Sequence, residues 1–261
     1  YCGPDMLNGT FNFDLIFASW NPGKMLKCVL NWESALHEGA WPTQVLNNHD
    51  RVRTATRYHA PENDERLKVA AAMLLTLRGT PFLYAGEEIG MRDIKFTRDE
   101  VQDPIGKHYW PFNKGRDGCR SPIQWTSAAN AGFSTGKPWL KVNPNYVTRN
   151  VEAQASDQGS LLNFYRKLLH LRKATPALQS GMFVPLTYDP QQVLAYLRQV
   201  EGQTVLVALN FGKHKVKLAL GPRLENAKWE LLLSNKRDEL PKIEKGWLHL
   251  QGDEVCILKQ K

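Results

Sequence analysis

Two kinds of hydrophobic spacing divide the chain near residue 178. Before that point, short apolar runs typical of buried strands alternate with segments whose apolar residues recur every three or four positions, as on one face of a helix. The expected strands cover residues 11–13, 41–47 and 80–84, and the expected helices cover 22–38, 65–78 and 160–175. Strands that alternate with helices predict βα units and a parallel sheet.

Capping residues support the expected helix ends. Asn21 before Pro22 is typical of an N-cap followed by the first helical position. Asn63 or Asp64 is expected to cap the second helix, and Pro176 is expected to stop the third. A closed (β/α)₈ barrel needs eight strands and typically about 250 residues, so residues 1–178 can form only its trailing part.

Residues 179–261 show only short strands of alternating polarity, separated by turn signals such as Gly221-Pro222. The strand candidates are Val193–Arg198, Thr204–Phe211, Val216–Leu220, Trp229–Leu233, Trp247–Leu250 and Val255–Leu258. This pattern predicts an all-β C-terminal domain built as an antiparallel sandwich. The fold class is therefore α/β, a partial TIM barrel followed by a β-sandwich.

Composition and charge exclude several classes of partner. The 34 Lys and Arg against 26 Asp and Glu give a net charge of +8, but the charges are dispersed and no nucleic-acid-binding motif accompanies them. No apolar run approaches the roughly 18 to 20 residues of a membrane span. The four cysteines lie far apart, which argues against a metal site and favours a cytoplasmic chain with free thiols. Because Tyr1 stands where a Met would begin a chain, we expect an N-terminal part to be missing.

Three motifs carry candidate chemistry. Residues 45–53, with Asn48-His49-Asp50 and Arg53, follow an expected strand; such a carboxylate can hold sugar hydroxyls, or it can simply cap a strand-end turn. In residues 79–91, Glu87 is expected to hydrogen-bond to backbone and not to touch substrate. In residues 115–125, Arg116 can bind hydroxyls.

For Arg120 and Asp117 in this third motif we expect an internal ion pair that stiffens the loop. The motif lies within a long connection between residues 84 and 160. Connections of this length are usually functional or disordered. Aromatic residues argue against disorder, namely Tyr109, Trp110, Trp125, Trp139 and Tyr146.

Taken in this order, the motifs resemble glycoside hydrolase family thirteen of the α-amylase superfamily, in the branch of α-glucosidases, oligo-1,6-glucosidases and trehalose synthases. Residues 48–50 with Arg53 are similar to the family's fourth signature region, after the seventh barrel strand. Other stretches match in sequence order: 11–13 the sixth strand, 79–91 the eighth strand and its loop, and 116–125, 130–133 and 137–140 the loop of this branch. Residues 1–178 would then run from about strand 6 to helix 8.

The resemblance implies a retaining mechanism with two carboxylates, a nucleophile and an acid. The family carries these after its fourth and fifth strands, and no motif of this chain matches either, so no residue is assigned to them. Asp50 matches the family's third carboxylate, a catalytic residue that holds ring hydroxyls in the transition state. His49 and Arg116 match substrate-binding residues, and Arg53 matches a less direct substrate-binding position.

The resemblance thus implies the C-terminal fragment of an α-glucosidase that hydrolyses α-glucosidic bonds in short oligosaccharides without a cofactor or metal. We expect the fragment to be inactive alone and to need the missing part of its barrel as a partner. The alternatives are a trehalose synthase or other α-transglucosylase, a non-catalytic glucosidase-like binding protein, and a mature fragment with a structural role. Residues 48–50 and Arg116 favour a sugar site over the binding protein.

Overall fold

The computed structural model describes residues 5–7, 9–37, 39–186 and 191–261, so Cys2 lies outside the described residues. Contacts within the chain define two compact units. The first unit comprises residues 1–45, 68–82 and 166–261, and the second comprises 46–67 and 83–165. These units interleave in sequence, and the predicted domain boundary between 178 and 179 stays a prediction.

Parallel strands begin the first unit, as the alternation of strands and helices predicts. Strand β1 (Thr43–Val45) pairs in parallel with β2 (Thr80–Phe82), and Phe11 forms a parallel bridge to Thr43. The strand expected at 11–13 is wrong beyond this bridge, because helix α1 (Phe13–Phe17) starts there. The cause is Asn12, whose side chain accepts a hydrogen bond from the backbone N of Leu15 and turns the chain into a helix.

The longer helices follow the predicted periodicity. They are α2 (Pro22–Ala35), α4 (Glu65–Thr76) and α7 (Leu161–Ala174), followed by the short α8 (Pro176–Ser180). Asn21 caps α2 by accepting from Lys24 N at 2.8 Å, as its position before Pro22 predicts. Asn63 accepts from Glu65 N at 3.3 Å at the start of α4, which decides between the two capping candidates in favour of Asn63.

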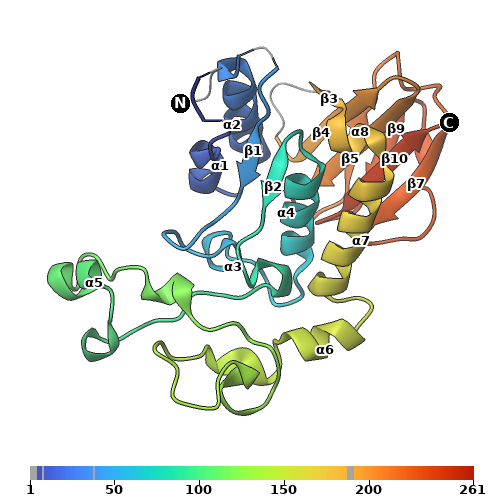
Figure 1. Ribbon diagram of the computed structural model, residues 1–261. Helices are drawn as coiled ribbons and strands as arrows, with labels where there is room; N and C mark the ends of the chain where they lie inside the picture. Colours follow the sequence, from blue (N-terminus) through green and yellow to red (C-terminus); the bar gives the residue numbers. More distant parts are fainter. Residues whose placement is uncertain (1–4, 8, 38, 187–190) are drawn as a thin grey trace. The chain divides into compact units, whose positions relative to one another are not determined.

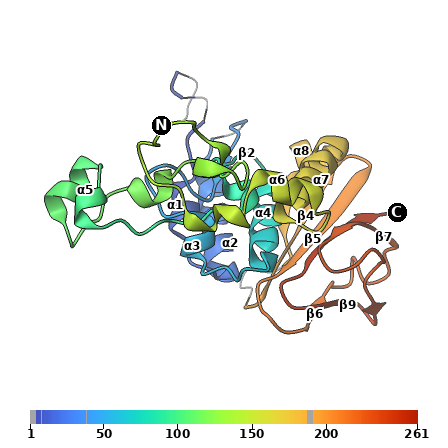
Figure 2. The ribbon, with the colours of Figure 1, turned by 90° about the horizontal axis from the view of Figure 1, so that it is seen from below.

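The C-terminal strands form two antiparallel sheets (Figures 1 and 2). The five-stranded sheet has the order β3 (Met182–Pro185), β4 (Val193–Val200), β5 (Gln203–Asn210), β10 (Val255–Gln260) and β7 (Trp229–Ser234), and the three-stranded sheet has the order β6 (Val216–Ala219), β9 (Trp247–Leu250) and β8 (Ile243–Glu244). Leu206 and Leu258 from the first sheet share one buried cluster with Leu218 and Leu248 from the second. All six predicted strands are present, and the predicted sandwich is confirmed.

The second unit holds the long connection, drawn green to yellow in Figure 1, together with α3 (Thr54–Arg57). Its elements are short: η1 (Glu87–Ile89), η2 (Arg98–Glu100), α5 (Pro104–Tyr109), η3 (Asp117–Arg120), η4 (Ala129–Gly132), η5 (Pro144–Val147) and α6 (Val151–Ser156). Its apolar core includes Ile89, Met91 and Leu162. The connection is therefore ordered, as its aromatic residues predict.

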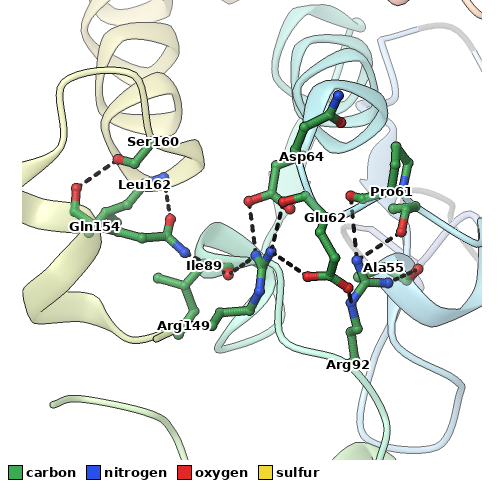
Figure 3. Close-up of polar contacts among 12 residues, drawn as sticks. Ala55, Pro61, Glu62, Asp64, Ile89, Arg92, Arg149, Gln154, Ser160 and Leu162 are labelled. Atoms are coloured by element: carbon green, nitrogen blue, oxygen red, sulfur yellow. Dashed lines mark hydrogen bonds and ion pairs between the residues drawn. The ribbon is translucent and has the colours of Figure 1, made fainter. Parts of the chain in front are cut away.

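The buried Arg149 and the half-buried Arg92 tie this connection to residues 54–64 of the same unit (Figure 3). Arg149 donates to Asp64 Oδ2 at 2.9 Å, to Ile89 O at 3.0 Å and to Glu62 Oε2 at 3.1 Å. Arg92 lies on the other side of the same Glu62, with its Nε 3.0 Å from Oε1. Because hydrogen bonds replace regular secondary structure here, the shape of the unit depends on a few charged side chains.

Two further observations concern membrane-spanning helices and metal-binding groups. None of the helices among the described residues has both the length and the apolar character that crossing a membrane requires. In the same described ranges, no group of three or more His, Cys, Asp or Glu side chains is arranged to hold a metal ion.

Candidate functional site

Asp50 projects from a turn that follows β1 in the sequence. The side chain of Asn48 accepts a hydrogen bond from Asp50 N at 2.9 Å, which fixes the turn. The side chains of His49 and Asp50 are 65% and 45% exposed, so both can reach a ligand from solvent. The strand-end turn is therefore capped by Asn48, which leaves the Asp50 carboxylate available for another task.

Three positively polarised groups converge on one oxygen of Asp50. Arg116 Nη1 lies 3.0 Å from Oδ1, Arg120 Nη2 lies 2.9 Å from it, and His49 Nε2 lies 3.5 Å from it. Desolvation is the largest single influence and would raise the pKa of Asp50, but the hydrogen bond from Arg116, the charge of His49 and the hydrogen bond from Arg120 together outweigh it and lower the pKa. Among the described residues, Oδ2 has no hydrogen-bond partner.

Asp103 positions Arg116, and sequence analysis missed it. Its carboxylate is fully buried and accepts from Arg116 Nε at 2.7 Å, from Arg116 N at 2.8 Å and from Ile105 N at 3.1 Å at the start of α5. The hydrogen bond from the Arg116 side chain, which outweighs desolvation, lowers the pKa of Asp103 to about 2. Asp103-Pro104 in the sequence is an N-cap signal, but nothing in it indicates an ion pair with Arg116.

The ion pair expected between Arg120 and Asp117 is wrong. Asp117 Oδ2 instead accepts from the backbone N atoms of Gln102 and Asp103, at 2.6 and 3.0 Å. Arg120 donates to Asp50 and, from its Nε, to the backbone O of His49 at 2.8 Å. Both arginines of the loop therefore form ion pairs with Asp50, because Asp117 instead accepts hydrogen bonds from the backbone of residues 102–103.

Arg53 does not join the Asp50 cluster. Its side chain is buried, with Nη1 donating to Ala85 O at 2.9 Å and the guanidinium 4.9 Å from the centre of the Tyr84 ring. Its backbone N donates to Asp93 Oδ1 at 2.8 Å. Desolvation by burial lowers the pKa of Arg53. The residue thus links the Asp50 turn to residues 84–93 of the same unit.

Glu87 is also buried, and it makes the backbone hydrogen bond that its motif predicts. It accepts from Tyr84 N at 3.4 Å and from Thr54 Oγ1 at 2.9 Å. Burial raises the pKa of Glu87 to about 7, against the lowering effect of the hydrogen bond from Thr54. With only 6% of the residue exposed, Glu87 supports α3 and the following loop from inside.

This arrangement is suited to holding hydroxyl groups. Asp50 stays ionised because its pKa is lowered, so it does not act as a proton donor near neutral pH. Its free oxygen Oδ2 can accept from a hydroxyl, while the exposed His49 ring and the partly exposed Arg116 guanidinium can donate or share hydrogen bonds beside it. Such a set of groups can form hydrogen bonds with a polyhydroxylated ligand and places a fixed negative charge beside it.

Family models match nearly the whole chain. Residues 8–181 match the catalytic domain of α-amylase, and residues 183–251 match the C-terminal domain of maltogenic amylase. The first match alone covers more than half of the 261 residues.

Curated relatives and solved structures agree with these models. The chain is 36% identical over 274 residues to the probable oligo-1,6-glucosidase 2 of Bacillus subtilis, covering 92% of this chain and 49% of that protein. It is 32% identical to the trehalose-6-phosphate hydrolase of Escherichia coli, covering 90% and 48%. Isomaltulose synthase from Klebsiella sp. LX3 superposes with a TM-score of 0.87 at 29% identity, covering 98% and 51%. The chain spans about half the length of these relatives.

Proposed function

The chain belongs to the α-amylase family of glycoside hydrolases, in the branch of the oligo-1,6-glucosidases, and from this premise we propose that its Asp50 cluster binds one glucose unit in the active site of a retaining α-glucosidase. The observation that carries the proposal is the asymmetry of the Asp50 carboxylate. Oδ1 is occupied by Arg116 and Arg120, whereas Oδ2 has no partner among the described residues. An oriented, ionised carboxylate of this kind can accept hydrogen bonds from sugar hydroxyls.

Each site residue has a distinct part in this proposal. Asp50 is the catalytic residue of the chain, since hydroxyls that shift as the oxocarbenium-like transition state forms can bind its carboxylate more strongly there than in the ground state. His49 and Arg116 bind hydroxyls of the same glucose. Arg53 is a positioning residue, because its buried guanidinium holds residues 84 and 85 against the turn.

The proposed substrates are α-glucosidic bonds in short oligosaccharides, cleaved in a whole enzyme with no cofactor or metal. We propose that residues 1–261 bind such a saccharide but do not hydrolyse it alone. The reason is that none of their motifs matches the family's nucleophile or acid, and the retaining mechanism needs both. The remaining part of the barrel is then the required partner. The cysteines Cys28, Cys119 and Cys256 are free, which fits a cytoplasmic location.

Transglucosylation is the second candidate function. It is favoured by the likeness to isomaltulose synthase and to trehalulose synthase, the latter with a TM-score of 0.87 at 31% identity. Hydrolysis and transfer share the glucosyl-enzyme step and differ in whether water or a sugar hydroxyl completes the reaction. Product analysis of a whole enzyme on sucrose and isomaltose separates the two, because transfer yields a new disaccharide.

The proposed binding role is tested on the purified 261-residue chain. Isothermal titration with isomaltose should give a binding step that Asp50→Asn weakens, and p-nitrophenyl α-glucoside should not be hydrolysed. Ordinary turnover by the chain alone would contradict the proposed division of the active site. Equal isomaltose binding by the wild type and Asp50→Asn would contradict the role of Asp50.

A further inference from the structure

A cavity of about 470 Å³ lies in the same unit as the Asp50 cluster. It is lined by residues of η2 and by residues 137–139, 141 and 142, together with Tyr146 of η5. We call it the Trp139 pocket, and the residues that carry the argument are Phe96, Asp99, Glu100, Trp139, Lys141 and Tyr146. None of these six residues belongs to the Asp50 cluster.

Aromatic rings supply the apolar wall of the Trp139 pocket. The Trp139 residue is 71% exposed, although an indole is among the groups that most gain from burial. Phe96 is half-buried, and the ammonium group of Lys141 lies over its ring, 4.9 Å from the ring centre. A large, exposed indole face beside a cavity can stack on the apolar face of a flat ligand ring while the ligand's edge stays hydrated.

Polar groups of balanced charge surround these rings. Lys141 Nζ lies 2.7 Å from Glu100 Oε2, and this hydrogen bond lowers the pKa of Glu100 to about 2. Asp99 is exposed, and its carboxylate has no hydrogen-bond partner among the described residues. With Lys137 also in the lining, the cavity holds two carboxylates and two ammonium groups. A pocket without net charge selects a neutral polar ligand over an anion.

The loop that carries Trp139 is held in place before any ligand binds. Asn130 Nδ2 donates to Ser134 O at 3.1 Å and to Gly136 O at 3.0 Å, just before Lys137. Asn130 and Ala131 both have left-handed backbone conformations, with φ of 54° and 59°. Such conformations cost free energy in residues other than Gly and occur where the surrounding structure enforces them. The pocket is therefore preorganised.

We propose that the Trp139 pocket is a second saccharide-binding site, which stacks one pyranose ring on Trp139 and binds its hydroxyls with Asp99 and the Glu100–Lys141 pair. The ligand class, an α-glucosidic oligosaccharide, rests on the proposed function of the Asp50 cluster. The pocket itself rests on its own geometry. A neutral, ring-shaped and polyhydroxylated ligand matches an exposed indole with carboxylate acceptors beside it.

The pocket is also connected to the Asp50 cluster through the backbone. Glu100 and Gln102 line the pocket, and Gln102 N and Asp103 N both donate to Asp117 Oδ2. Asp103 in turn holds Arg116, which reaches Asp50. A saccharide bound in the pocket would therefore contact the segment 100–103, which also positions Arg116 of the first site.

The test titrates maltotriose and isomaltotriose into the 261-residue chain, with heat and indole fluorescence as two readouts and sorbitol as the control ligand. Trp139→Ala should weaken one binding step at least about tenfold, a loss of about 1.4 kcal/mol. Trp139→Phe, which keeps an aromatic face, should restore most of the affinity. Asp99→Asn should weaken the same step, and Trp247→Ala, which removes a 45% exposed indole of β9, should not change it.

Each result decides the proposal. A saccharide-binding step that is lost in Trp139→Ala but kept in Asp50→Asn supports the pocket. This result holds even if the proposed function of the Asp50 cluster fails. Saccharide binding that Trp139→Ala, Trp139→Phe and Asp99→Asn all leave unchanged overturns it, as does the absence of any such step at millimolar ligand. If Trp139→Ala fails to fold by circular dichroism, Trp139→Phe and Asp99→Asn decide. Loss of a step only in Asp50→Asn overturns the pocket and supports the first site.

Discussion

The fully buried carboxylate of Asp103 holds Arg116, with Oδ2 2.7 Å from Nε and 2.8 Å from the backbone N of the same residue. The outer nitrogen Nη1 of this guanidinium is thereby directed at Asp50 Oδ1, 3.0 Å away. These two hydrogen bonds to Asp103 remove much of the freedom of a long side chain, so Arg116 reaches Asp50 at a low entropic cost.

Asp103→Asn should therefore weaken ligand binding at the first site, although Asp103 itself does not contact the ligand. An amide cannot pair with the guanidinium as a carboxylate does, so we expect isomaltose affinity to fall about tenfold and the free energy of unfolding to fall by about 1–3 kcal/mol. Titration calorimetry and urea denaturation measure the two effects. Glu152→Gln, an exposed carboxylate on α6, is the matched control. Unchanged affinity in Asp103→Asn would show that Arg116 does not need this support.

Asp50→Asn separates catalysis from stability. In a whole enzyme that carries this segment, we expect kcat to fall by about 10²- to 10³-fold, because the fixed charge that stabilises the transition state is lost. The melting temperature should hardly move, since Asp50 is exposed and Asn48 caps its turn. Steady-state kinetics and thermal melting on the same variant measure both. Near-normal kcat with a lowered melting temperature would mean that Asp50 is structural.

Glu87 should make stability fall as pH rises. Its pKa is about 7 in the folded chain against an ordinary value of 4.5, so between these pH values the folded state keeps a proton that the unfolded state has released. Its contribution is fully present below pH 4.5 and is lost as the pH rises through 7. Glu87→Gln should flatten this slope by up to about 1.4 kcal/mol per pH unit.

Urea denaturation at intervals from pH 5 to pH 8 measures the slope. Glu88→Gln changes the net charge equally at the neighbouring, half-buried position and serves as the control. A Glu87→Gln slope that matches the wild type across this range would show that Glu87 is ionised throughout the folded state.

Arg149 should be more important for stability than for binding. Arg149→Met leaves Asp64, a mostly buried carboxylate, without its ion pair, and removal of one partner of a buried pair typically costs about 3–5 kcal/mol. Denaturation of the variant tests this, with the exposed Arg98→Met as control. A loss no larger than that of Arg98→Met would mean that Figure 3 shows a network with little energetic weight.

Local patterns in the sequence predict the elements of this fold well. The Asn21-Pro22 cap and the alternating strands of the sandwich depend on neighbours in sequence, which a single chain displays directly. Three residues at 11–13 are too few for a period to distinguish strand from helix, and the cap at Asn12 decided for the helix.

The site was only partly predictable. The structure brings Asp50, His49 and Arg116 together, whereas the side chain of Arg53 is buried and does not reach them. Asp103 was missed because it lies 13 residues from Arg116, with no periodicity that links them. Which carboxylate a loop arginine pairs with depends on tertiary packing, and this is also why Arg120 was assigned to the wrong partner.

Cys119 lies directly behind the site, with its thiol 3.4 Å from the backbone O of His49 and 3.1 Å from that of Arg116. Burial raises the pKa of this thiol to about 11, so very little thiolate exists at neutral pH and alkylating reagents can react only when the loop opens. The half-buried Cys28 belongs to another part of the chain, and Cys256 is buried in the sandwich. The rate at which iodoacetamide labels Cys119 therefore measures how often the Arg116 loop leaves the His49 turn, and no cysteine has to be introduced by mutation.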